Sequence, residues 1–291
     1  MNEPVGGANV VLPQSDWHPR RDAHVARVQA LVGAHRQRRA AHRAHPVVDF
    51  LFTYYSYKPT QLLRWHPGYG VTLTGADEYA GWRGYHRTVD GVTADPAFLE
   101  RRRDTVEFTL HLLTATAARP PHLSCFGLHE WAMVYRSDEV RHSTVPLRLG
   151  PAGTDAVVES MPLRCTHFDA FRFFTPEAVP RNAAPLTRAD QIRTEQPGCL
   201  HVSMDLYKWC YKLAPLIDSE FTVDCFELAM AARELDMRAS PYDLSGYGYD
   251  AVPIETPGGR AEYVRGQLAL AERAGGLREA LAQRCRDLLG G

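Results

Sequence analysis

The segment GLHEWAMVYR places a histidine beside a glutamate inside an apolar run, a combination suited to acid–base chemistry. The pattern predicts a helix over residues 125–142 that is apolar on both sides, with Phe126 and Met133 beside Glu130 at helical spacing. Because desolvation favours the protonated carboxyl, Glu130 is a catalytic candidate, and His129 is a substrate-binding neighbour. The alternative is that Glu130 pairs with a buried arginine and His129 with a backbone carbonyl.

A second segment, RCTHFDAFRFF, combines His167, Asp169 and Arg172 with four phenylalanines. His-x-Asp offers two metal ligands from one side of an extended chain, and Phe171 could form one wall of a stacking pocket. Asp169 is therefore a catalytic candidate, with His167 and Arg172 as substrate-binding candidates. The alternative is that the phenylalanines belong to the core, whereas burying the polar residues requires partners.

A third segment, CLHVSMDLYKWCYKL, predicts a helix with one polar stripe that contains His201, Asp205, Lys208 and Lys212. The other positions are largely apolar or aromatic, which favours burial and turns the stripe toward an internal cleft. There Asp205 could act as a base or orient His201, also a catalytic candidate, while Lys208 meets an anion of the substrate. The alternative is a solvated face.

Six of these side chains are types that bind metal ions, and a subset of them could hold a divalent metal. The candidates are His129, Glu130, His167, Asp169, His201 and Asp205. Glu139 and His142 have the E-x-x-H spacing of di-iron bundles, but the sequence has no matching second copy. On a continuous helix His142 would lie about 20 Å from His129, so these two histidines could not share a metal.

Aromatic and basic residues elsewhere suggest contacts with bases and phosphates. Tyr54, Tyr55 and Trp65 lie in a turn-rich segment with nearby cations and are candidates for stacking on a planar ring. The helix predicted over residues 17–45 is rich in arginine between Arg20 and Arg43, which suits DNA phosphates. The alternatives are an interface between helices for the aromatics and a solvated face for the arginines.

These candidates must be positioned by a mainly helical fold. We expect a flexible arm over residues 1–15 and a single compact helical domain over 16–291, with a small β-hairpin or loops near 68–95. Pro96 and Thr256-Pro257 have the residue types of helix starts. Further helices are predicted over 95–120, 187–197, 199–214, 219–238 and 257–288, the last broken at Gly275-Gly276.

Composition excludes several classes of protein. The 291 residues are 45% hydrophobic, with 33 basic and 34 acidic side chains, so no strong overall charge points to nucleic acid or membrane. The sequence has no P-loop and no dinucleotide-binding fingerprint. Six scattered cysteines, the lack of a signal-peptide pattern and the lack of a bilayer-spanning apolar run predict a cytoplasmic protein without a membrane partner.

Together with HPVVDFLFTYYSYKPTQLLRWHPGYG, the three segments resemble an actinobacterial family commonly labelled 3-methyladenine DNA glycosylase, over about residues 15–285. The resemblance implies a hydrolase in DNA repair that excises an alkylated purine by cleaving its N-glycosidic bond without a redox cofactor. The Leu-Pro-Gly-Val-Gly-type turn of hairpin glycosylases has no counterpart here, so the resemblance assigns no catalytic residue.

Three functions therefore remain as hypotheses. The first is an N-glycosidase that binds DNA through its basic helix and needs no cofactor. The second is an enzyme acting on a small cytosolic metabolite, with or without a divalent metal. The third is a non-enzymatic ligand-binding protein whose polar stripes are buried ion pairs.

Overall fold

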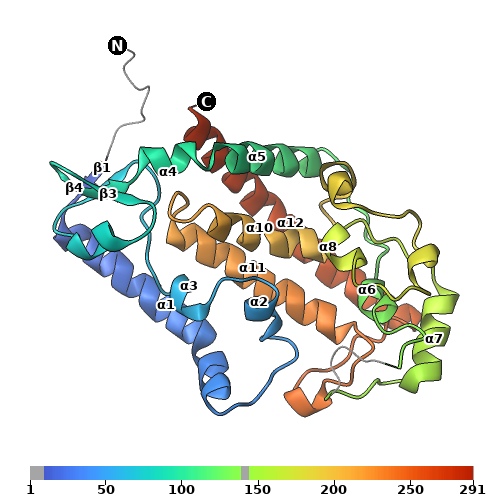
Figure 1. Cartoon of the computed structure of the whole chain (residues 1–291). Helices are drawn as coiled ribbons and strands as arrows, with labels where there is room; N and C mark the ends of the chain where they lie inside the picture. Colours follow the sequence, from blue (N-terminus) through green and yellow to red (C-terminus); the bar gives the residue numbers. More distant parts are fainter. Residues whose placement is uncertain (1–9, 139–143, 291) are drawn as a thin grey trace.

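The centre of the molecule is a group of packed helices in the computed structural model, which describes residues 10–138 and 144–290 (Figure 1). Helix α10 packs along α11, and α12 contacts α5, α10 and α11. The bounds of these helices are Arg103–Ala117 for α5, Leu200–Lys212 for α10, Ser219–Arg238 for α11 and Pro257–Leu289 for α12. The prediction of a mainly α fold is confirmed.

Helix α10 lies at the middle of this group because its sequence is apolar on most sides. Every residue from Leu200 to Cys210 is buried. Its polar side chains therefore face the interior, as the cleft interpretation predicted, and the solvated-face alternative is wrong for all but its last turn. Buried polar groups must find partners inside the protein.

Helix α12 is continuous, and the predicted break at Gly275-Gly276 is wrong. Ala274 and Arg278 on either side of the glycines are buried, so packing holds this turn although glycine disfavours a helix. The predicted start is confirmed, since the Thr256 hydroxyl accepts a hydrogen bond from the Gly259 N–H at 3.0 Å.

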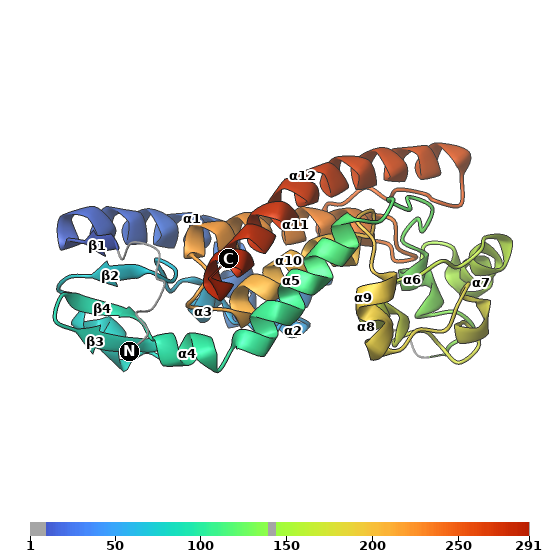
Figure 2. The same ribbon diagram turned by 90° about the horizontal axis from the view of Figure 1, so that it is seen from above.

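A four-stranded sheet lies at one end of the molecule, beside the start of α1 (Figures 1 and 2). Strand β1 pairs in parallel with β2, and β4 pairs antiparallel with both β2 and β3. The β3–β4 hairpin lies in the region where one was predicted. The strands are β1 (Val10–Leu12), β2 (Val71–Leu73), β3 (Tyr85–Thr88) and β4 (Gly91–Ala94).

The predicted arm is corrected from Val10 onward. Its apolar residues form β1, where the Val10 N–H donates to the Gly70 carbonyl at 2.9 Å, and α1 begins at Gln14. Residues 1–9 lie outside the described residues. The adjacent β-branched residues Val10 and Val11 favour a strand, but its partner strand lies about sixty positions further along the chain, beyond the reach of local patterns.

The predicted basic helix is α1 (Gln14–Ala40), whose Trp17, Val28 and Val32 are buried against the rest of the fold. Two short helices follow it in the segment that contains Pro59. The helix predicted over 95–120 is interrupted at Arg101-Arg102, and Pro96 occupies the expected first position. The short helices are α2 (Phe50–Thr53), α3 (Pro59–Leu62) and α4 (Pro96–Glu100).

The helix predicted over 125–142 is wrong in length. Only α6 (Leu128–Ala132) forms, preceded by Phe126 and Gly127 and followed by Arg136, all three with positive φ. Residues 139–143 lie outside the described residues, and with them the E-x-x-H pair. Because the chain turns at Arg136, the 20 Å separation inferred for a continuous helix no longer applies.

Short elements around α6 form the end of the molecule opposite the sheet (Figure 2). They include α7, which the sequence did not predict, and α9, the shortened form of the helix predicted from residue 187. The helices are α7 (Gly150–Ser160), α8 (Phe168–Phe171) and α9 (Gln191–Thr194), with 3-10 turns η2 (Val179–Arg181), η3 (Arg188–Asp190) and η4 (Ser245–Tyr247). The 3-10 turn η1 (Asp77–Gly81) lies at the other end, against β3 and β4. Within 10–138 and 144–290, no helix is both long and apolar enough to span a bilayer.

Candidate metal centre

Two groups of buried polar side chains meet at His201, on the first turn of α10. The His201 ring centroid lies 4.4 Å from that of His129 and 5.2 Å from that of His167. The first polar group is His129, His201 and Asp236, and the second polar group is His167, Glu195 and Asp205. In each group, one potential ligand atom per residue lies within 4.8 Å of the others.

The first polar group brings together α6, α10 and α11. His129 Nε2 and Asp236 Oδ1 are 2.8 Å apart, and the side chains are 7% and 0% exposed. Despite this distance, both atoms lack a hydrogen-bond partner of acceptable geometry within the described part of the chain. Two buried acceptor-capable atoms so placed are suited to sharing a third partner, such as a cation.

Arg233 fixes the carboxylate of Asp236 from behind. Its guanidinium donates to Glu130 Oε1 at 2.6 Å and to Asp236 Oδ2 at 3.1 Å, leaving Asp236 Oδ1 facing His129. The same guanidinium lies 3.9 Å from the centroid of the Phe50 ring. Two carboxylates share this one guanidinium, and their remaining negative charge favours positive charge at His129 or on a bound cation.

This arrangement decides between the two interpretations of Glu130. The carboxylate is buried as predicted, but it forms an ion pair with Arg233 rather than facing only apolar side chains. The buried-arginine alternative is therefore confirmed. His129 faces Asp236 and not the backbone carbonyl that was the alternative for it.

Electrostatics keep His201 in the form that binds metals. Burial, reinforced by the neighbouring His129, holds the pKa of His201 well below its ordinary value, so its imidazole is neutral. Burial also acts to lower the pKa of His129, but Asp236 outweighs it and the net shift is upward. The pKa of Asp236 is lowered, because His129 outweighs the opposing effect of burial.

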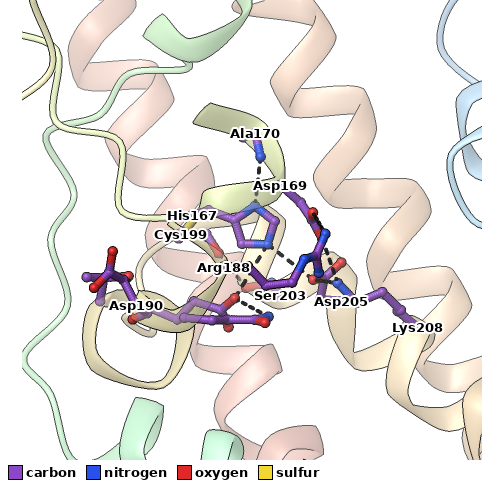
Figure 3. A network of polar contacts seen from close by, with 12 residues as sticks. His167, Asp169, Ala170, Arg188, Asp190, Cys199, Ser203, Asp205 and Lys208 are labelled. Carbon is purple, nitrogen blue, oxygen red and sulfur yellow. Dashed lines mark hydrogen bonds and ion pairs between the residues drawn. The ribbon is translucent and has the colours of Figure 1, made fainter. Parts of the chain in front are cut away.

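The second polar group differs, because its hydrogen bonds are satisfied by the protein (Figure 3). The Ala170 N–H donates to His167 Nδ1 at 3.2 Å, so the proton of the neutral ring is on Nε2, 3.1 Å from Asp205 Oδ2. Tyr55 donates to the other Asp205 oxygen at 3.0 Å. Lys208 also donates to Asp205, so an ammonium already occupies the position that a cation would take.

Glu195 completes the second polar group without changing this conclusion. Its Oε1 lies 3.7 Å from His167 Nε2 and accepts a hydrogen bond from Gln191 at 2.7 Å. Burial raises the pKa of Glu195. Burial acts in the same direction on Asp205, but Lys208 and His167 outweigh it and hold the pKa of Asp205 well below its ordinary value.

Other predicted site residues lie at varying distances from these groups. Asp169 accepts from Arg188 at 3.1 Å and faces Lys208 at 3.4 Å and Arg172 at 3.4 Å, so it links the second polar group to the surface. Phe171 is core, packed against Phe174.

The predicted aromatic walls divide between two places. Tyr54 borders a cavity with Glu130, and Tyr55 bonds to Asp205. Trp65 is not at this site, because it stacks on Trp17 in a separate apolar cluster beside the sheet, with ring centroids 6.2 Å apart. Its position follows from long-range packing, which the local aromatic pattern did not indicate.

Small cavities adjoin the first polar group. One of about 20 Å³ is lined by His129, His201 and Tyr263, and one of about 10 Å³ lies beside Glu130 and Tyr54. Each has room for about one water molecule, so a planar base does not fit in this conformation. Cys125, Cys165 and Cys199 line the larger cavity as thiols, since burial raises their pKa, to about 12 for Cys165.

The basic helix α1 is partly neutralised by α11. Arg20 pairs with Glu220 at 2.9 Å, and Arg27 pairs with Asp224 at 2.7 Å. Paired arginines are less available for DNA phosphates. Sequence reasoning missed Arg233, Asp236 and Glu195. For the first two, the signal was a charged pair three positions apart in a helix rich in apolar residues.

No family model, curated protein or solved structure matches the chain.

Proposed function

We propose that the protein is a metal-dependent hydrolase that holds one divalent ion with His129, His201 and Asp236. The observation that carries this proposal is the buried pair of His129 Nε2 and Asp236 Oδ1, which lie 2.8 Å apart without hydrogen-bond geometry and beside a neutral His201. Two imidazoles and one carboxylate form a ligand set used for zinc and iron, with positions left open for substrate. An ion at such a site acts as a Lewis acid or activates water.

The surroundings of the first polar group support this assignment. Arg233 orients Asp236 through its second oxygen, as outer-shell partners do for metal ligands. The cavity that borders His129 and His201 has a volume of about 20 Å³, enough for a water nucleophile. In the second polar group, by contrast, Lys208 and Ala170 satisfy the atoms that a metal would need.

The test is metal analysis of protein purified without a histidine tag. We expect about one equivalent of zinc, iron or manganese, lost in Asp236→Asn and in His201→Ala. Glu195→Gln is the matched control, because it removes a buried carboxylate from the second polar group only and should retain the metal. Circular dichroism would establish that each variant is folded.

A metal that is absent from wild-type protein and does not raise its melting temperature when added would overturn the proposal, since a ligand specific to the native state stabilises it. Retention of full stoichiometry in both Asp236→Asn and His201→Ala would also overturn it. The melting experiment uses wild-type protein and remains informative if a variant fails to fold.

A second candidate is the N-glycosidase implied by the family resemblance. It is favoured by the position of Glu130 at a cavity that also borders Phe50 and Tyr54, a carboxylate with aromatic side chains beside it. The cavity of about 10 Å³ must open before it admits a base. DNA binding through Arg36, Arg38, Arg39 and Arg43 would be part of this activity.

A further inference from the structure

A cationic groove lies between the sheet end of the molecule and the last turn of α10. We define it by its charged side chains Arg64, Arg83, Arg102 and Lys212, and its volume is about 440 Å³. This volume is within the range of small-molecule sites. No carboxylate of the described residues lines it, and His66, Trp82, Phe98 and Tyr211 are among its other walls.

The four cations have no carboxylate partners within residues 10–138 and 144–290. Aromatic faces hold all four of them instead, including Lys212, whose Nζ lies 4.9 Å from the Trp209 centroid. Arg64 Cζ lies 5.2 Å from the Trp82 centroid, and Arg83 and Arg102 lie 5.7 and 5.5 Å from that of Phe98. Cation–π contact leaves guanidinium N–H groups able to bind an anion.

Neighbouring arginines do have carboxylate partners, so the lack of such partners is specific to the arginines that line the groove. In the run Arg101-Arg102-Arg103, Arg101 lies 3.6 Å from Asp95 and Arg103 lies 3.2 Å from Glu100. Arg102, between them, is the member of the run that lines the groove. Four like charges around one concave space repel each other unless an anion is bound.

Two titratable groups of the groove have shifted pKa values. Burial and the nearby Lys208 lower the pKa of Lys212, against the opposing effect of Asp205 and Asp169. His66 adds no charge, because burial and Arg64 lower its pKa to about 3. The excess positive charge therefore comes from three arginines and one lysine.

We propose that the cationic groove binds a nucleotide, with its phosphate on Arg64, Arg83, Arg102 and Lys212 and its ring against the half-buried Trp82 or Tyr211. Guanidinium groups are suited to bidentate phosphate contacts, and an aromatic face suits a planar ring. Lys212 follows His201 by eleven residues of α10, about 16 Å along the helix axis. The groove is therefore separate from the first polar group and does not depend on the proposed metal.

Calorimetric titration with AMP, adenosine and inorganic phosphate tests the proposal. We expect AMP to bind at least tenfold more tightly than either adenosine or phosphate, and more weakly as salt is added. Arg102→Ala should weaken AMP binding at least tenfold, and Arg83→Ala should act in the same direction. Arg101→Ala is the matched control, since this arginine pairs with Asp95 and is not among the groove-lining residues.

Three results would overturn the proposal. They are no AMP binding at millimolar concentration, equal weakening by Arg101→Ala and Arg102→Ala, and tight binding of single-stranded oligothymidylate without binding of AMP. The last result would assign the surface to nucleic acid. Metal content measured in the same samples tests the metal proposal separately, so failure of the nucleotide proposal can be told from failure of the metal proposal.

Discussion

At the scale of single residues, the guanidinium of Arg233 determines the setting of both Glu130 and Asp236. Removing a guanidinium from between two buried carboxylates would leave uncompensated charge, which is costly. An isosteric change of one carboxylate is milder, because the amide oxygen of glutamine still accepts from Arg233. Glu130 is therefore the residue at which the two candidate functions make different predictions.

In the metal proposal, Glu130 does not touch the ion and acts through Arg233, which holds Asp236. We expect Glu130→Gln to bind one equivalent of metal with an affinity about 10–100-fold lower, because the site loses negative charge and one outer-shell partner. Competition with a chelating dye measures this change. The surface variant Glu159→Gln is the matched control, since Glu159 pairs with Arg136 at the surface and lies outside the first polar group.

An unchanged affinity in Glu130→Gln would contradict the outer-shell role, and loss of the metal equivalent would make Glu130 itself a ligand. The N-glycosidase hypothesis concerns a different readout, release of base from alkylated DNA. It requires release by wild-type protein and its loss in the folded Glu130→Gln variant. Wild-type protein that releases no base would reject it.

Part of this site was predictable from residue types alone. His129 and His201 were candidates because each lies in an apolar segment, where a polar side chain needs a partner. Asp236 and Arg233 were not, because an i, i+3 charged pair on a helix is more typical of a solvated face. Their burial follows from the packing of α11 against α10, which involves long-range contacts.

At the scale of elements, the predictions for α6 and α12 were wrong in opposite directions. The apolar run after Cys125 predicted a long helix, but backbone turns at Phe126, Gly127 and Arg136 restrict α6 to Leu128–Ala132. In α12, two glycines predicted a break, but buried neighbours keep the helix continuous. In both segments tertiary packing overrides local propensity, which is small per residue.

The continuity of α12 leads to a prediction at Gly276, an exposed helical position where an added Cβ would meet nothing within 4 Å. We expect Gly276→Ala to raise the free energy of unfolding by about 0.5–1 kcal/mol, because alanine loses less backbone entropy in a helix. Urea denaturation measures this change.

Gly259 in the same helix is the matched control. Its added Cβ would lie 2.0 Å from the Pro253 carbonyl oxygen, so Gly259→Ala should destabilise the protein. If Gly276→Ala were neutral or destabilising while Gly259→Ala behaved as expected, α12 would be broken at the glycines in solution.

At the scale of the whole molecule, the helical class and the hairpin region were predictable, whereas the relative placement of segments was not. Alternating and helical patterns act within a few residues, and they located α1, α10 and α11. The pairing of β1 with β2 and the location of Trp65 beside Trp17 depend on contacts between distant segments. The cationic groove likewise joins side chains from four separate parts of the chain.

The same long-range packing makes stability depend on pH, most clearly at His66. This side chain is buried and bonds to the Tyr85 hydroxyl at 2.9 Å, and burial, with Arg64 and His24, lowers its pKa to about 3. An unfolded histidine has a pKa of about 6.5. Between these values the unfolded state binds one more proton than the folded state, so stability is full above pH 6.5 and decreases as the pH falls below it.

The expected loss from His66 at pH 5 is about 2 kcal/mol, from about 1.5 pH units at about 1.4 kcal/mol each. In His66→Asn, the difference between the free energies of unfolding at pH 7 and pH 5 should be smaller by this amount. Urea denaturation with a chelator present measures both values without a contribution from bound metal. His24, His35 and His45, whose pKa values burial also lowers, continue to contribute in the variant, so a residual decrease is expected.

His111→Asn, at an exposed position of α5, is the matched control and should keep the wild-type difference, because this side chain is solvated in both states. Parallel pH profiles for wild type and His66→Asn would contradict the prediction. They would mean that His66 accepts a proton in the folded protein, which requires water or an anion to reach it through the cationic groove that it borders. The pH dependence of wild-type stability, measured with AMP, would then distinguish entry of water from entry of an anion. A bound anion favours the protonated imidazole, so AMP would change the pH dependence, whereas entry of water alone would leave it the same with and without AMP.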